Sequence, residues 1–356
     1  MKSFDDSVKA PSKKSVRKSG EVLAGRSDVM PIEEAMKILS DWRTLHAYPL
    51  TALQSHMRRL IKRHHMEKSL IAQRLKRTPS IIGKLTRFES MSLDRMQDIG
   101  GIRVIVPKMA DVRKLHSLIV ESKTFRHHLE LPPKDYIEHP KLDGYRSLHQ
   151  VIKYRDINHE ALNGLKIEIQ IRTRLQHSWA TAVETVGLLE RASLKTGEGD
   201  EKTKRFFKLV SALFSIDERC PVLDEYANMT LTELISETAK LEDELSILKK
   251  LEGVAVSAHR IDLMAKAGFT GFHVIQLHIP ERSVRMYGFD DLEDAEIYYK
   301  SKEGNVKDDP NVSVLLMSAG DLKDIKKAYP NYFLDTKAFI QNVRRIMALG
   351  DRLAGR

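Results

Sequence analysis

The hydrophobic positions of the chain change spacing along its length. Up to about residue 71 they recur every three or four residues, as in Leu53, Met57 and Leu60, which predicts helices from Pro31 onward. The same helical spacing returns at 111–122, where Asp111 is a plausible cap, at 175–186 and at 203–214. Short apolar or alternating runs predict strands at 102–107, 145–154 and 165–173.

The last part of the chain has a pattern of its own. An amphipathic helix is expected at 231–251, where Leu234, Leu241, Leu245 and Leu248 form one stripe suited to a connector or a dimer seam. Beyond it we expect strands at 272–279, 283–289, 295–301 and 312–318, and helices at 321–329 and 335–349. The predicted organisation is a flexible basic tail (1–28), a large domain (29–225), a helical connector (228–252) and a small α+β domain (253–356).

Composition limits the class of protein. The 356 residues, 42% of them hydrophobic and 30% charged, are typical of a soluble protein with a real core. We find no apolar run that could span a membrane and no secretory signal, and Cys220 is the only cysteine, so a cytoplasmic location is expected.

Positive charge is concentrated in one segment. The net charge is +10, and the stretch from Gln54 to Arg87 holds ten Lys or Arg residues against one acid, Glu67. A solvated helix face would explain such a run equally well in general, but here the lack of acidic partners favours phosphate as the ligand. Around the Pro79 turn, QRLKRTPSIIGKLTR presents a set of cations suited to polyphosphate: Arg74, Lys76, Arg77 and Lys84.

Two strands carry polar residues that suit catalysis. In LKIEIQIRT the isoleucines share one face, which leaves Glu168, Gln170 and Arg172 on the other, either in water or on the floor of a site. Asp98 stands before the 102–107 strand, and a bulge or close approach at Gly100-Gly101 would bring it to the side of Arg103. Two such carboxylates can hold Mg²⁺.

The stretch PKLDGYRSLHQVIKY places Tyr145, Ser147 and His149 on one strand face after a turn. A single histidine beside a core strand is more often a hydrogen-bonded structural residue than a base. The chain has neither a P-loop nor a kinase signature set.

Taken together, RLKRTPSIIGK, DIGGIRV, DYI-x-x-PK-x-x-GYRSLH and EIQIRT closely resemble the synthetase domain of RelA/SpoT-type alarmone synthetases, over about residues 55–190. The resemblance implies a mixed β-sheet flanked by helices, as in nucleotidyltransferases. It also implies an enzyme that moves the β,γ-pyrophosphate of ATP to the 3′-hydroxyl of GDP or GTP.

Site roles are carried over from the resemblance, motif by motif. It implies that Arg74 and Arg103 sandwich the adenine, that Lys76, Arg77 and Lys84 meet the ATP phosphates, and that Asp98 and Glu168 hold Mg²⁺. Glu168 would also help to deprotonate the attacking hydroxyl. Tyr145 would stack on the acceptor guanine, and the remaining site residues would be His149, Gln170 and Arg172.

The chain departs from the family pattern at several points. Arg77 stands where a serine is usual, and HSWATAVETVG lacks the histidine that commonly follows its glutamate. The N-terminal third has no His-Asp pair for alarmone hydrolysis, so a synthetase without hydrolase activity is expected.

Two other functions stay open. One is transfer to the 3′ end of tRNA, as in toxic small relatives, and the other is a non-catalytic nucleotide- or RNA-binding regulator. The C-terminal domain is open to restraining the synthetase, binding a protein trigger or antitoxin, or supporting a homo-oligomer. Its YPNYFLDTKAFI segment (329–340) suits a packed helix junction better than a binding surface.

Overall fold

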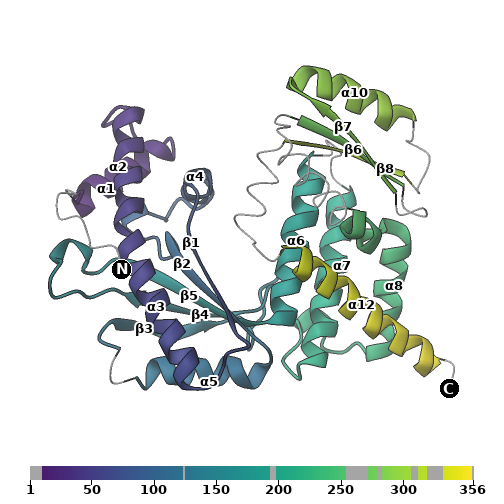
Figure 1. Cartoon of the computed structure of the whole chain (residues 1–356), viewed down its shortest axis with the longest axis horizontal. Coiled ribbons are helices and arrows are strands. Elements are labelled where there is room, and N and C mark those ends of the chain that lie inside the picture. Colours follow the sequence, from purple (N-terminus) through teal and green to yellow (C-terminus); the bar gives the residue numbers. More distant parts are fainter. Residues whose placement is uncertain are drawn as a thin grey trace. The chain divides into compact units, whose positions relative to one another are not determined.

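The larger sheet of the structure has five strands and is mixed, as the family resemblance implies. The computed structural model describes residues 10–122, 125–192, 198–253, 272–278, 283–305, 312–318 and 332–354. It divides into two units, one of residues Met1–Ile137 and Ser147–Thr173, the other of Glu138–Arg146 and Arg174–Arg356. In unit 1 the sheet order is β1 (Leu70–Leu75), β2 (Gly100–Val106), β5 (Lys166–Thr173), β4 (Leu148–Lys153) and β3 (His128–Asp135) (Figure 1).

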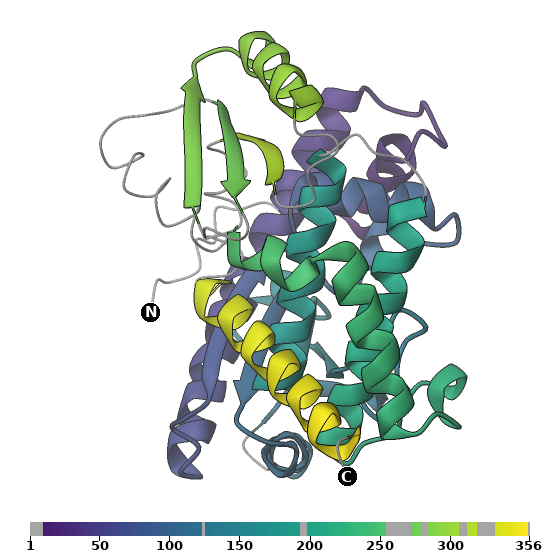
Figure 2. The same ribbon diagram turned by 90° about the vertical axis from the view of Figure 1, so that its right-hand side faces the viewer.

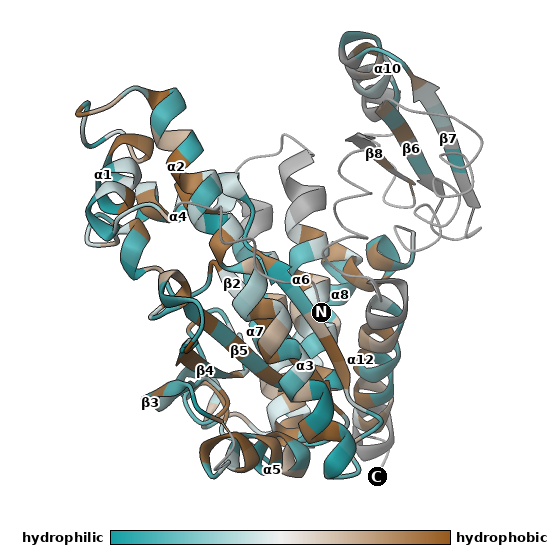
Figure 3. Cartoon of the chain, turned by 60° about the vertical axis from the view of Figure 1, so that its left-hand side comes forward, coloured by the Kyte–Doolittle hydropathy of each residue, from teal (hydrophilic) through white to brown (hydrophobic). Residues whose placement is uncertain are grey.

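Only β2 and β5 run parallel, and each of the other neighbouring pairs is antiparallel. Apolar and polar residues alternate along β5, so one face of the sheet is apolar and the other is polar. Ile167, Ile169 and Ile171 are buried on the apolar face. Hydrophobic and hydrophilic residues follow one another along β4 and β5 in Figure 3.

Two helices cover the apolar face of the sheet: α3 (Ala47–Arg63) and α5 (Met109–Val120). A Cβ added at Gly100 would lie within 4 Å of Leu50 in α3, and His116 of α5 lies 3.1 Å from Gln150 on the same face. Unit 1 also contains α1 (Lys13–Leu23), α2 (Ile32–Leu45), α4 (Thr78–Arg87) and the short 3₁₀ helices η1 (Leu93–Arg95) and η2 (Glu160–Leu162).

The predicted flexible tail is wrong for residues 13–23, which form α1. Ser12 caps this helix, and Val16 is fully buried. Gly20 allows a close approach, because a Cβ there would lie 2.7 Å from the Cβ of Leu93. The part of the tail before residue 10 lies outside the described residues.

The hydrophobic pattern does not predict two strands of the sheet. Helical spacing predicts a helix up to about residue 71, yet β1 pairs along its whole length with β2. The β3 strand contains Pro132 and Pro133 and its register shifts there, which is tolerated because β3 lies at the edge of the sheet.

Unit 2 has a helical core. Its helices are α6 (Arg174–Ala192), α7 (Glu198–Asp217), α8 (Leu231–Leu245) and α12 (Tyr332–Ala354), with a 3₁₀ turn, η3 (Asp224–Tyr226). Figure 2 shows α12 in yellow, running obliquely across the helical core, where it packs against α6 and α8. Phe339 of α12 is fully buried and its ring centroid lies 5.9 Å from those of both Phe207 and Phe214.

The predicted boundary between domains 29–225 and 253–356 does not match this packing. The buried side chains of α12, which lies in the second predicted domain, belong to the same core as those of α6, α7 and α8. The predicted leucine stripe is also part of that core, so 231–251 is not an isolated connector. The helix is interrupted at Ser246, which has φ 52°, and both carboxylate oxygens of Glu242 accept from the amide of Leu248, 3.0 Å away.

A small α+β segment contains the remaining elements. Strands β7 (Ser283–Phe289), β6 (Phe272–His278) and β8 (Val312–Ser318) form an antiparallel sheet that packs with α10 (Leu292–Asn305). The strand predicted at 295–301 is wrong: this stretch is helical, and Ala295 and Tyr299, one turn apart, are buried. The predicted 321–329 helix and the start of the 329–340 segment lie outside the described residues.

Candidate active site

One face of the five-stranded sheet carries most of the predicted site residues. The register places Arg74, Gly101 and Glu168 opposite one another on β1, β2 and β5. Arg103, Gln170 and His149 form the next row across β2, β5 and β4. Because residues two apart on a strand share a face, both rows lie on the side away from α3 and α5. Arg172 is also on this face and is almost completely buried.

Glu168 lies at the centre of a buried polar group. Its Oε1 lies 3.0 Å from Nδ1 of His149, and its Oε2 accepts from the amide nitrogen of Gln170 at 2.8 Å. Burial by itself would raise the pKa of Glu168, but the hydrogen bond and charge of His149, together with Gln170 and Lys134, outweigh it and lower the pKa to about 2. The carboxylate is therefore ionised at neutral pH.

His149 is held from two sides. In addition to its contact with Glu168, its ring meets Tyr136 edge to face, with 5.1 Å between the centroids. The histidine therefore orients the carboxylate, in agreement with the structural role favoured by the sequence.

Asp98 is at the centre of a second group. Its Oδ2 accepts from Lys76 Nζ at 2.7 Å and its Oδ1 from Lys84 Nζ at 3.0 Å. Burial would raise the pKa of Asp98, but the charges and hydrogen bonds of the two lysines hold it below the ordinary value. Lys84 belongs to the last turn of α4, whose N-cap is the exposed Arg77.

Three residues that the sequence analysis did not select extend these groups. Lys134 donates to Gln97 Oε1 at 2.7 Å, and the amide nitrogen of Gln97 donates to Glu130 at 2.9 Å. Lys134 is opposite His149 in the register, and its charge acts on Glu168. Lys134 directly precedes the DYI motif. If β3 is assigned as a strand, its pairing with β4 puts Lys134 on the polar face.

The residues present suit a hard divalent cation in their donor chemistry. Asp98 and Glu168 both offer ionised carboxylate oxygens, and Mg²⁺ is commonly held by one or two carboxylates together with substrate phosphates and water. The described residues contain no group of three or more His, Cys, Asp or Glu arranged to hold a metal by protein ligands alone.

The bulge expected at Gly100-Gly101 is not present, since the pairing of β2 with both neighbours continues through it without a shift. The alternative, a close approach, is found: a Cβ at Gly100 would lie 2.5 Å from Cδ1 of Ile167.

Tyr145 belongs to unit 2, where two helices hold its turn. Gly144 has φ +90°, and Ser211 of α7 donates to its carbonyl at 2.6 Å. The ring of Trp179 in α6 also packs against Gly144, and its Nε1 donates to the carbonyl of Phe207 in α7 at 2.8 Å. The Lys141 ammonium lies 5.0 Å from the centroid of the Tyr145 ring.

A buried ion pair anchors the far side of the turn. Arg146 donates to Glu218 at 2.8 Å, and both side chains are almost completely buried. Gln176 donates to the same carboxylate oxygen at 3.0 Å. Ser211 and Glu218 are seven residues apart, so α7 and the residue just after it hold the turn at two points.

We expect Gly144→Ala to lower the free energy of unfolding by about 2 kcal/mol, because a Cβ would be strained at this φ and would lie 3.1 Å from both Ser211 and Trp179. Urea unfolding measures the change. Gly83→Ala is the control, since a Cβ there meets nothing within 4 Å and alanine favours the α4 helix. Equal effects of the two substitutions would contradict the strained turn.

Comparison with known proteins identifies the central segment. Residues 73–186 match the family model described as the region found in RelA / SpoT proteins. The GTP pyrophosphokinase YwaC of Bacillus subtilis is 26% identical over 166 residues, covering 43% of this chain and 78% of that protein. The GTP pyrophosphokinase YjbM of the same organism is 25% identical over 190 residues, covering 51% and 82%.

Among solved structures, small alarmone synthetase 1 from Bacillus subtilis, bound to its product pppGpp, matches 51% of this chain and 94% of its own. Its TM-score is 0.43 at 24% identity. The resemblance predicted from the motifs is confirmed by the family model and the curated relatives. No helix among the described residues is long and apolar enough to cross a membrane.

Proposed function

Because residues 73–186 are a RelA/SpoT-type region, we propose that this chain is a pyrophosphotransferase that uses ATP to convert GDP or GTP into a (p)ppGpp alarmone. The observation that carries the proposal is the polar sheet face, where an ionised, buried Glu168 lies in the row of Arg74 and next to the row of Arg103. The relatives YwaC and YjbM, which bear the name GTP pyrophosphokinase, support it.

In the proposed reaction, the 3′-hydroxyl oxygen of the acceptor attacks the β-phosphorus of ATP. The bond from that phosphorus to the oxygen bridging the α-phosphate breaks, AMP leaves with the electron pair, and Glu168 helps the hydroxyl proton to pass to solvent. Transfers of this kind depend mostly on positioning and on cations near the developing charge.

The cations for this step are already close together. Lys76 and Lys84 both form ion pairs with Asp98. The N-terminus of α4, where backbone amides are free to bind an anion, lies between the two lysines in the sequence. When a triphosphate binds, its oxygens can replace Asp98 as the partners of the two ammonium groups. The Asp98 oxygens then become available to a metal ion. When bound, Mg²⁺ supplies further positive charge on the phosphates, and its ligands on this chain would be Asp98 and Glu168.

The remaining residues bind and orient the two nucleotides. Arg74 and Arg103 contact the adenine from neighbouring strands, and Arg77 adds a phosphate contact at the α4 N-terminus. Gln170 and His149 hold Glu168 towards the acceptor hydroxyl, with Arg172 beside them. Tyr145 stacks on the acceptor base, an interaction worth about 1–3 kcal/mol.

Incubation of the purified protein with ATP labelled in the β-phosphate tests this function. We expect the label to appear in a nucleotide product when GDP or GTP is supplied, and AMP to form in equal amount. Label transferred to tRNA, and not to either nucleotide, would instead establish the tRNA-modifying activity. Binding of ATP without transfer to any acceptor would indicate a regulator.

A further inference from the structure

Two arginines outside the segment matched by the family model hold the backbone on either side of α4. Arg43 of α2 donates from Nε to the carbonyl of Lys76 at 2.9 Å, two residues before α4 begins. Arg26, which follows α1, donates from its two terminal nitrogens to the carbonyls of Leu85 at 2.9 Å and Met91 at 3.0 Å. Residues that precede the family segment therefore hold α4 at its start and at its end.

The contact of Arg43 bears on the site through Lys76. This residue lies where the chain leaves β1, and its amide donates to the carbonyl of Ile99 at 2.7 Å. The side chain of Lys76 reaches Asp98, the neighbour of Ile99. Because Arg43 binds the carbonyl of Lys76, both backbone polar groups of this residue are held, and the origin of its side chain is fixed.

The contact of Arg26 acts on the other end of the helix. The carbonyls in the last turn of an α-helix have no partner within the helix, and Leu85 is in the last turn of α4. Arg26 follows a Schellman motif that ends α1: Gly25 has φ 70°, and the amides of both residues donate to carbonyls in the last turn of α1. The end of α4 that carries Lys84 is therefore fixed by the turn after α1.

The two arginines are carried by one packed pair of helices. Ser19 of α1 donates to the carbonyl of Ala35 in α2 at 2.8 Å, and both residues are completely buried. Helix α1 also packs against α4 and η1 (Figure 3), where Arg17 lies 3.3 Å from the almost completely buried carboxylate of Asp94. Because α1 and α2 pack together, the contacts at the two ends of α4 belong to one rigid support.

We propose that the α1–α2 pair positions the ATP-binding segment, and that Arg43 and Arg26 are positioning residues for ATP. The inference rests on the proposed function, in which Lys76 and Lys84 contact the ATP phosphates, and adds to it two residues outside the family segment. Each arginine acts through a backbone carbonyl and not on the substrate. A displacement of about 1 Å in binding groups can cost about a hundredfold in rate, so the position of these lysines matters.

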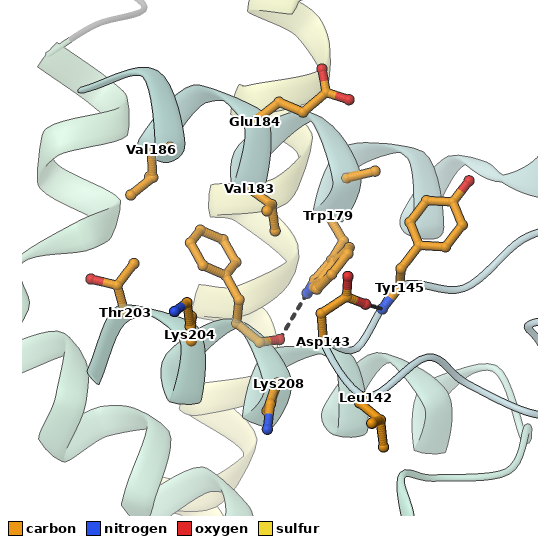
Figure 4. Close-up of a pocket in the computed structure, with 13 residues that line it drawn as sticks. Leu142, Asp143, Tyr145, Trp179, Val183, Glu184, Val186, Thr203, Lys204 and Lys208 are labelled. Atoms are coloured by element: carbon orange, nitrogen blue, oxygen red, sulfur yellow. Dashed lines mark hydrogen bonds between the residues drawn. The ribbon is translucent and has the colours of Figure 1, made fainter. Parts of the chain in front are cut away.

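The acceptor side has separate supports. Tyr145 belongs to unit 2, where Figure 4 shows it beside Trp179 of α6. The turn before it accepts a hydrogen bond from Ser211 of α7. Loss of either arginine should therefore change the KM for ATP and leave the KM for GDP unchanged, whereas a general loss of folded structure would change both.

Arg43→Met is expected to raise the KM for ATP about tenfold, because a charge-assisted hydrogen bond to the Lys76 carbonyl is lost, while kcat and the KM for GDP stay unchanged. Initial rates at varied ATP and GDP measure this difference. Lys37→Met is the matched control, since it removes a positive charge from the same helix, where Lys37 pairs with Asp41. An unchanged KM for ATP in Arg43→Met, or an equal rise in both KM values, would overturn the proposal.

Arg26→Lys tests the bridge at the end of α4. The lysine keeps the positive charge but lacks the planar fork with which Arg26 reaches the carbonyls of Leu85 and Met91. We expect this variant and Arg26→Met to raise the KM for ATP to a similar extent, by about threefold to tenfold. A raised KM in the methionine variant alone would mean that only the charge matters, and would contradict the bridge.

Equilibrium dialysis of ATP without an acceptor distinguishes failure of this inference from failure of the proposed function. If no acceptor is modified but Arg43→Met binds ATP about tenfold more weakly than the parent protein, the positioning role stands and the proposed function fails. If transfer occurs and the two proteins bind ATP equally, the proposed function stands and the inference fails. ATP binding that falls only in proportion to the unfolded fraction, measured by circular dichroism, also overturns the inference, and a parent protein that binds no ATP overturns both.

Discussion

Replacing Glu168 with glutamine is expected to reduce pyrophosphate transfer by roughly a thousandfold, while ATP binding is largely retained. The substitution keeps the shape of the side chain and removes the negative charge that His149 and Gln170 stabilise. Loss of one such charged group from a preorganised site costs about two to four orders of magnitude in rate. Single-turnover measurement of AMP release gives the rate, and equilibrium dialysis gives ATP affinity.

Glu160→Gln is a suitable control, because Glu160 is exposed in a surface turn of the same unit. The Glu168 variant should also unfold at nearly the same urea concentration as the parent protein. Transfer within threefold of the parent rate in a folded Glu168→Gln protein would remove Glu168 from the mechanism.

The second large effect concerns stability. Phe339→Ala is expected to lower the free energy of unfolding by about 3–5 kcal/mol, because the ring is fully buried between Phe207 and Phe214 and its removal leaves a cavity. Urea unfolding followed by circular dichroism measures the loss. Lys337→Ala, two residues earlier and exposed, should change stability by less than about 0.5 kcal/mol.

This result bears on the role of the C-terminal region. A chain ending near Leu251 would lose the whole of α12, including Phe339, Ile340 and Val343, all of which are buried in the helical core. We therefore expect such a truncation to be destabilised, so its activity would not report on autoinhibition. A stable truncated chain, together with a loss below about 1 kcal/mol for Phe339→Ala, would show that α12 is dispensable.

The polar face of the sheet could be predicted because local alternation determines it. Glu168, Gln170 and Arg172 alternate with three isoleucines, and burying the isoleucines leaves no other side for the polar residues. The contact between Glu168 and His149 follows from the pairing of β4 with β5, which the tertiary structure decides.

The errors occur where tertiary packing overrides local preference. Residues 295–301 are rich in aromatic and β-branched side chains, yet they are helical because Ala295 and Tyr299 both pack in the small core with Val274. The β3 strand was missed because two prolines are acceptable only at a sheet edge, and edge position is not a local property.

By itself, the sequence determined the motif residues, their order, and the strand face shared by Glu168, Gln170 and Arg172. These depend on residue type and on a period of two, which are both local. Only the tertiary structure decided that Lys76 and Lys84 share Asp98, that α7 holds the Tyr145 turn, and that α12 completes the helical core. Such contacts join residues far apart in the chain, and their energy comes from burial and hydrogen bonding that exist only after the elements have packed together.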